Sequence, residues 1–117
     1  MDADADGFCS SALLINYLHH YYPNWVEDKL KYYLHSDKQH GLEDCTNWII
    51  EQSPALVLIP DAGSNDYAYH EALYKKGIKV CILDHHSAPK ISEYAVTINN
   101  QLSSYPNKQF CGCGIVW

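Results

Sequence analysis

The sequence predicts one α/β domain with a mainly parallel β-sheet flanked by helices. Two short apolar runs, 55–60 and 78–83, are typical of strands that are buried on both faces. A segment with helical spacing separates them and ends at Gly77, because glycine is favoured just after the last turn of a helix. Strands that alternate with helices in this way build parallel sheets, which gives the fold class.

The remaining elements follow from periodicity along the chain. Apolar residues at helical spacing predict a first helix that Pro23 ends, because proline cannot continue a helix. Partial alternation in the letters KLKYYL predicts a short strand, and a weaker apolar run predicts the last strand. The expected helices cover 8–22, 43–52 and 66–76, and the two further strands cover 29–34 and 94–99.

Composition narrows the possible classes of protein. A chain of 117 residues with 47% hydrophobic residues can form one domain with one core. No apolar run approaches the roughly 18 residues that cross a membrane. The five cysteines match no zinc or disulfide spacing, so we expect reduced thiols and a cytoplasmic protein. With 14 acidic against 8 basic residues, the chain shows no broad basic surface for nucleic acid.

Polar residues follow both buried strands at the point where each strand ends. Asp61 comes directly after the strand 55–60, and the triplet Asp84, His85 and His86 follows the strand 78–83. Ligands of parallel sheets collect beyond the carboxyl ends of the strands. We therefore expect a carboxylate and two imidazoles at one rim, although polar residues also occur simply where a strand leaves the core.

A third acidic cluster, DADADG, opens the chain. Asp2, Asp4 and Asp6 are two residues apart, and carboxylates gathered in an extended or tightly turning segment repel one another unless a cation binds. An EF-hand loop begins with a similar pattern, but it needs a glutamate at its twelfth position, where this chain has Leu13. The alternatives that remain are a cation site and a solvated acidic segment.

The three clusters together resemble a known family. DADADG, LIPDAGSND and LDHHSAP, in this order and spacing, are similar to the first three motifs of the DHH phosphoesterase superfamily, especially its RecJ-like branch of single-strand-specific exonucleases. The segment SSYPNKQFCGCGIVW also resembles the region of that branch where a glycine-rich stretch opens the next helix. The resemblance implies a metal-dependent phosphodiesterase that acts on single-stranded DNA or on short nucleotides.

The same resemblance implies a role for each motif residue. Two divalent metals, usually manganese with magnesium as an alternative, would bind Asp4, Asp6, a bridging Asp61 and His85, with Asp2 as a further acidic position. His86 matches the histidine that contacts the scissile phosphate, and Asp84 matches its support. Carboxylates with one imidazole suit these metals, and a metal pair can hold the hydroxide that attacks the phosphate.

The turn after Asp61 is the candidate substrate contact. Ser64 and Asn65 follow a glycine there, and their side chains and backbone amides could bind a phosphate. Cys111 and Cys113 are interpreted as small packing residues.

The chain also departs from the family pattern. The aspartate of the fourth motif is not found before Trp117, and neither the strand before the first motif nor the usual C-terminal substrate-binding domain is found. We therefore expect residues 1–117 to be a DHH domain fragment that is incomplete at both ends. Two alternatives stay open: a non-catalytic fragment that binds a metal or a partner, and a phosphatase of small or cyclic dinucleotides. The sequence does not separate DNA from RNA.

Overall fold

The computed structural model describes residues 3–36 and 41–117. Its sheet has three parallel strands in the order β1-β2-β3, which confirms the predicted fold class. The strands are β1 (Leu56–Pro60), β2 (Lys79–Asp84) and β3 (Val96–Asn99). The register pairs Pro60 with Leu83 and Asp84 with Asn99, so the carboxyl ends of all three strands lie at one edge.

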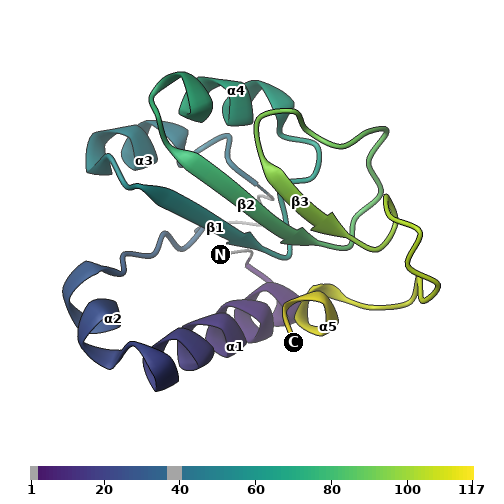
Figure 1. Cartoon of the computed structure of the whole chain (residues 1–117), viewed down its shortest axis with the longest axis horizontal. Helices are drawn as coiled ribbons and strands as arrows, with labels where there is room; N and C mark the ends of the chain where they lie inside the picture. Colours follow the sequence, from purple (N-terminus) through teal and green to yellow (C-terminus); the bar gives the residue numbers. More distant parts are fainter. Residues whose placement is uncertain (1–2, 37–40) are drawn as a thin grey trace.

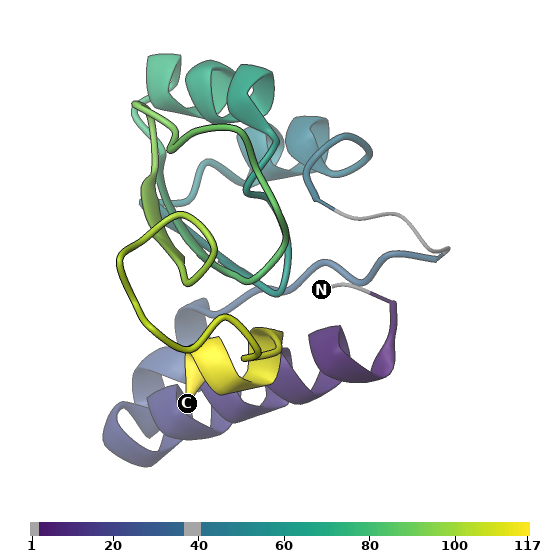
Figure 2. The same cartoon turned by 90° about the vertical axis from the view of Figure 1, so that its right-hand side faces the viewer.

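Helices lie on both sides of this sheet, as Figure 1 shows. On one side are α3 (Thr46–Gln52) and α4 (Tyr67–Lys75), and on the other are α1 (Ala5–Tyr21), α2 (Pro23–Lys29) and α5 (Gly112–Val116). The short α5 packs against α1, although the two are at opposite ends of the sequence (Figure 2). In the described part of the chain, no helix has the length and apolar character that a membrane span needs.

The hydrophobic core lies where α3 and α4 cover the sheet. Val80 and Ile82 alternate along β2, so both point to the same face, where Leu73 of α4 is fully buried. The core cluster consists of Leu42, Cys45, Ile49, Ile59, Ala62, Leu73, Ile78, Val80 and Ile82.

The region along β1 is packed less tightly. A cavity of about 570 Å³ extends from α1 and α2 past β1 to the beginning of α3. Leu14, Ile15 and Leu18 of α1 line one wall, and all three remain partly exposed.

The first helix begins earlier than the sequence predicts, at Ala5 instead of residue 8. Asp4 has an extended backbone and caps the helix, because its Oδ1 accepts a hydrogen bond from the Gly7 amide at 2.9 Å. Asp6 therefore lies in the first helical turn, and the expectation of an extended or tightly turning first motif is wrong at this residue.

The strand expected at 29–34 is also wrong. Pro23 ends α1 but then occupies the first position of α2, where its missing amide costs nothing, and that helix continues to Lys29. The following residues form no regular element; instead, the ring of Tyr33 packs 5.4 Å from that of Trp48. A strand forms only where a neighbouring strand can pair with it, and a short alternating pattern does not show whether such a partner exists.

Candidate metal centre

Asp61 is held at the carboxyl edge by its own backbone. Its amide donates to the carbonyl of Leu83 at 2.8 Å, which extends the pairing of β1 and β2 by one residue. Its φ of 63° lies in the left-handed region, which aspartate tolerates better than most residues. This sharp turn directs the chain away from the sheet, and the side chain is left 1% exposed at the rim.

His85 lies close to two of the predicted acidic ligands, Asp61 and Asp6. Its Nε2 lies 3.2 Å from Oδ1 of Asp61 and 3.6 Å from Oδ2 of Asp6. These residues come from the start of α1, the end of β1 and the end of β2, three points that are far apart in the sequence. Asp61, His85 and His86 also offer ligand atoms that all lie within 4.8 Å of one another.

Asp6 is oriented by the opposite end of the chain. Its two carboxylate oxygens accept the backbone amides of Gly112 at 2.7 Å and Cys113 at 2.8 Å, at the start of α5. Burial raises the pKa of Asp6, but these amides, the Cys111 side chain and nearby His85 outweigh it and lower the pKa below its usual value. Asp6 is therefore held as a carboxylate.

Gly112 is a site residue that the sequence reasoning missed. A Cβ at this position would overlap the Asp61 carboxylate, so only glycine lets the α5 backbone approach both Asp61 and Asp6. The signal was present in the letters GCG, which were linked to a helix start and not to the acidic cluster.

Asp84 holds the two histidines that follow it in the triplet, and its own side chain is fully buried. Oδ1 accepts the backbone amides of His85 at 2.8 Å and His86 at 3.2 Å, and it contacts Nδ1 of His86 at 2.7 Å. Oδ2 accepts the amide of Ser64 at 3.0 Å. Burial raises the pKa of Asp84, but the hydrogen bonds from Ser64 and His86 prevail and lower it. The charged Asp84 thus fixes the His86 ring.

Ser64 and Asn65, the predicted substrate contacts, lie in one wall of a 320 Å³ cavity that His86 also lines. The Ser64 side chain is buried, and its Oγ accepts a hydrogen bond from Asn99 at 2.8 Å. Asn65 is exposed and donates to the carbonyl of Ser87 at 2.9 Å. Both residues therefore brace the loops around the cavity.

Asn99 is a second residue that the sequence reasoning missed. This buried side chain at the end of β3 donates to Ser64 and, at 2.9 Å, to the carbonyl of His86. It therefore ties the loops after β1 and β2 together. An asparagine that ends a weak strand is a common turn signal, and the pattern alone does not indicate this role.

One of the predicted ligands, Asp4, stands apart from this cluster. The described contacts of the exposed Asp4 are local to the beginning of α1, where its side chain caps the helix. Asp2 lies outside the described residues. The structure thus brings together Asp6, Asp61 and His85, with His86 and Asp84 beside them.

The donors at this rim fit a divalent cation. Two carboxylates and an imidazole are the oxygen and nitrogen ligands that manganese and magnesium accept in proteins. Asp61 is 1% exposed, and a buried carboxylate is costly unless a cation or hydrogen-bond donors compensate its charge.

Comparison with protein families identifies the chain. The profile of the DHH family, N-terminal domain, matches residues 1–117. The chain belongs to the DHH family. Two relatives are 39% identical over 118 residues: a prophage-derived protein of Bacillus subtilis (strain 168) that carries the name single-strand DNA-specific exonuclease YorK, and its namesake in Bacillus phage SPbeta. All of this chain is aligned in both cases, but it spans only 19% of the length of either relative.

The DHH fold is also found in a solved structure. Exonuclease RecJ bound to manganese superposes with a TM-score of 0.79 at 21% sequence identity, over 98% of this chain and 29% of RecJ. At this identity the likeness establishes the fold. The neighbour contains manganese, and this DHH domain has a group of candidate metal ligands, Asp61, His85 and His86, at its rim.

Proposed function

We propose that this DHH domain is the metal-binding part of a phosphodiesterase that degrades single-stranded DNA. The observation that carries the proposal is the convergence of Asp6, Asp61 and His85 at the carboxyl edge, 3.2–3.6 Å between His85 and each carboxylate. The names of the relatives and the manganese in RecJ support the same chemistry. The wider prediction, that residues 1–117 are one unit of a longer enzyme with a separate substrate-binding domain, stays a prediction.

The proposed ligands are Asp6, Asp61 and His85, with Asp4 at the beginning of α1 as a further acidic group. Asp2, which lies outside the described residues, stays a predicted ligand. These residues would hold manganese, as a pair if the site is complete, and the bound metal would supply an activated water and neutralise charge on the phosphate. The amides of Gly112 and Cys113 hold the Asp6 carboxylate in place, so less conformational freedom is lost when a cation binds.

His86 has a separate role in this proposal. Because Nδ1 contacts the Asp84 carboxylate at 2.7 Å, the ring is fixed with Nε2 as its other polar atom. From this position Nε2 would donate a hydrogen bond to a phosphate oxygen or a proton to the leaving group. Asp84, which is fully buried, orients the ring and would stabilise a positive charge on it. Ser64 and Asn65 shape the neighbouring cavity, which we propose as the place for the adjoining nucleotide.

Hydrolysis of labelled single-stranded DNA with manganese tests the proposal in the longer protein that contains this domain. Removal of a bridging ligand in Asp61→Ala, or of the phosphate contact in His86→Ala, is expected to reduce the rate at least a hundredfold. His19→Ala, a change of an exposed histidine on α1, serves as the control and is expected to leave the rate unchanged. Full activity in Asp61→Ala would overturn the proposal.

Metal binding can be measured on residues 1–117 without any substrate. Manganese is expected to raise the melting temperature, because a ligand that binds only the folded state stabilises it. Asp61→Ala is expected to lessen the rise and His19→Ala to preserve it. The absence of both titration heat and thermal shift at millimolar manganese would contradict metal binding by this chain. Binding without hydrolysis in the longer protein would favour the non-catalytic alternative.

A further inference from the structure

Outside the rim, a second group of metal-ligating side chains gathers where α3 begins. His35, Asp44 and Cys45 each offer one ligand atom, and these atoms all lie within 4.8 Å of one another. Nδ1 of His35 is 3.0 Å from the Asp44 carboxylate. The geometry points to a binding site for a thiophilic divalent ion, such as zinc, formed by His35, Asp44 and Cys45.

The donor set differs in kind from that of the rim. Thiolate, imidazole and carboxylate together are ligands of zinc, whereas manganese and magnesium prefer oxygen. Tetrahedral zinc, with bonds of about 2.0–2.3 Å, keeps its donors roughly 3.3–3.8 Å apart. The His35–Asp44 pair is at 3.0 Å and all three donor atoms lie within 4.8 Å of one another, so side-chain rotations of the three residues can bring them to this spacing. Three protein ligands leave the fourth position for water.

The backbone that carries these donors is already fixed. Leu42 donates its amide to the Asp66 carboxylate at 2.8 Å, and Thr46 Oγ1 donates to the Leu42 carbonyl at 2.6 Å. His35 and Cys45 are 6% and 4% exposed. The Tyr33 hydroxyl donates to Asp44, the kind of outer contact that orients a ligating carboxylate. Little ordering is therefore required when an ion binds.

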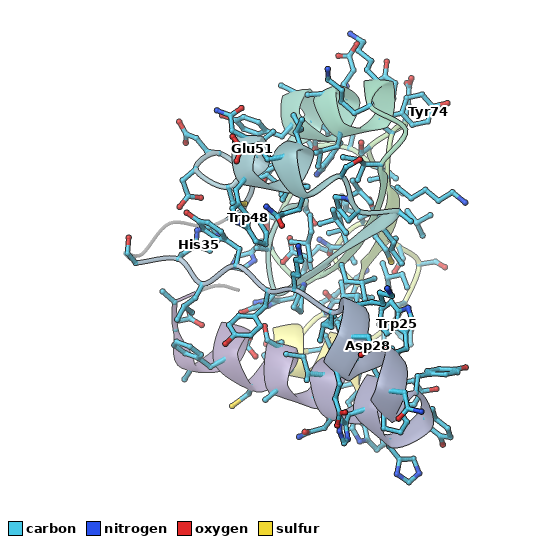
Figure 3. The ribbon with its side chains drawn as sticks, turned by 90° about the vertical axis from the view of Figure 1, so that its left-hand side faces the viewer. Trp25, Asp28, His35, Trp48, Glu51 and Tyr74 are labelled. Atoms are coloured by element: carbon cyan, nitrogen blue, oxygen red, sulfur yellow. The ribbon has the colours of Figure 1, made fainter. Side chains whose placement is uncertain are left out.

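An ion can reach this site from the large cavity along β1. His35 and Cys45 both line that cavity, and Asp44 is exposed at the surface. His35, labelled in Figure 3, belongs to the segment that passes between the α1–α2 layer and α3. The ring of Tyr33 lies between it and Trp48 of α3, 5.3 Å from the ring of His35 and 5.4 Å from that of Trp48. A bound ion would add to the contacts that already link this irregular segment to α3, which are the His35–Asp44 pair and the packing of Tyr33 against Trp48.

Binding is accompanied by the release of a proton. The Cys45 thiol now makes weak hydrogen bonds to the carbonyls of Gly41 at 3.7 Å and Leu42 at 3.6 Å. On coordination, the thiol proton passes to solvent, the sulfur donates an electron pair to the ion, and these two weak bonds are lost. His35 coordinates as a neutral imidazole.

Cobalt is a spectroscopic substitute for zinc that tests the site on residues 1–117. A sulfur-to-cobalt charge-transfer absorption is expected in the near ultraviolet and should disappear when zinc is added. Cys45→Ser is expected to abolish it, and Asp44→Asn, a change of an exposed side chain, to weaken cobalt binding at least tenfold. Circular dichroism checks that each variant is folded. If Cys45→Ser does not fold, the loss of cobalt affinity in Asp44→Asn still tests the site.

Two matched controls separate this site from the rim. Cys113→Ser removes a thiol close to Asp6, and Asp61→Asn alters the rim carboxylate; both are expected to keep the cobalt absorption. An absorption that is lost in Cys113→Ser and kept in Cys45→Ser would place the thiolate at the rim and overturn the inference. No such absorption at millimolar cobalt in the unmodified chain would overturn it equally.

Discussion

The two regions on either side of β1 differ in how completely they are packed. Towards β2 and α4, Leu73 and Ile82 are fully buried and the side chains form a continuous core. Towards α1 and α2, the half-buried Leu14, Ile15 and Leu18 face a cavity of about 570 Å³. Both regions have apolar sequences, so hydrophobicity alone does not predict which of them is tightly packed. The difference shows that an apolar face is buried only where a second element covers it.

The candidate metal centre takes residues from both regions. Asp61 and Asp84 are carried by paired strands and held by the packed side. Asp6 comes from α1, on the open side, and two amides of α5 orient it. Half of the site therefore depends on the better-packed region, and the other half depends on a contact between segments about one hundred residues apart.

The largest expected effect tests this difference in packing directly. Leu73→Ala removes a fully buried side chain and is expected to lower the free energy of unfolding by about 2–5 kcal/mol. Leu14→Ala, beside the cavity, is expected to cost about 1 kcal/mol because the side chain is already half exposed. Urea denaturation of both variants measures the two values. Equal losses would show that the two regions are packed alike.

A smaller effect is expected from the contact between α5 and the rim. The new methyl group of Gly112→Ala would overlap the Asp61 carboxylate, so α5 must shift and release Asp6. Manganese affinity is expected to fall at least tenfold by calorimetric titration. Gly114→Ala is the control in the same helix, because the atoms nearest to its methyl group would belong to Phe110, at an ordinary contact distance of 3.4 Å. If the two variants bind manganese equally, the α5 contact does not order the site.

The smallest effect is a change in how the stability of the fold depends on pH, and it comes from His70 in the better-packed region. Burial lowers the pKa of His70 below 6.5, and a hydrogen bond with Gly63 opposes this only in part. The folded state therefore binds protons less readily than the unfolded state. The neutral His70 favours folding fully above about pH 6.5, and this contribution is lost as the pH falls through the folded pKa.

His70→Gln should therefore reduce the fall in stability between neutral and mildly acidic pH. His19→Gln, a change on the exposed surface of α1, should leave the fall as it is. Chemical denaturation of the two variants at several pH values measures this slope. An unchanged slope in His70→Gln would mean that His70 does not titrate differently in the folded and unfolded states.

The elements with strong local signals were predicted correctly from the residues alone. The apolar runs became β1 and β2 because buried strands need continuous apolar residues, and Gly77 ends α4 in the left-handed conformation that glycine favours. The parallel order then placed Asp61 and His85 at one rim, since the carboxyl ends of parallel strands meet there. Local signals failed at 29–34, where pairing partners decide the outcome.

The groups that complete the site are brought together by the packing of distant elements. Asp4 and Asp6 look equivalent in the sequence, yet one caps α1 while the other meets His85, because Asp4 has an extended backbone before the helix and Asp6 lies in its first turn. The roles of Gly112 and Asn99 arise from contacts with residues distant in the sequence. Such contacts depend on how the elements pack, and no local pattern of residues encodes that packing.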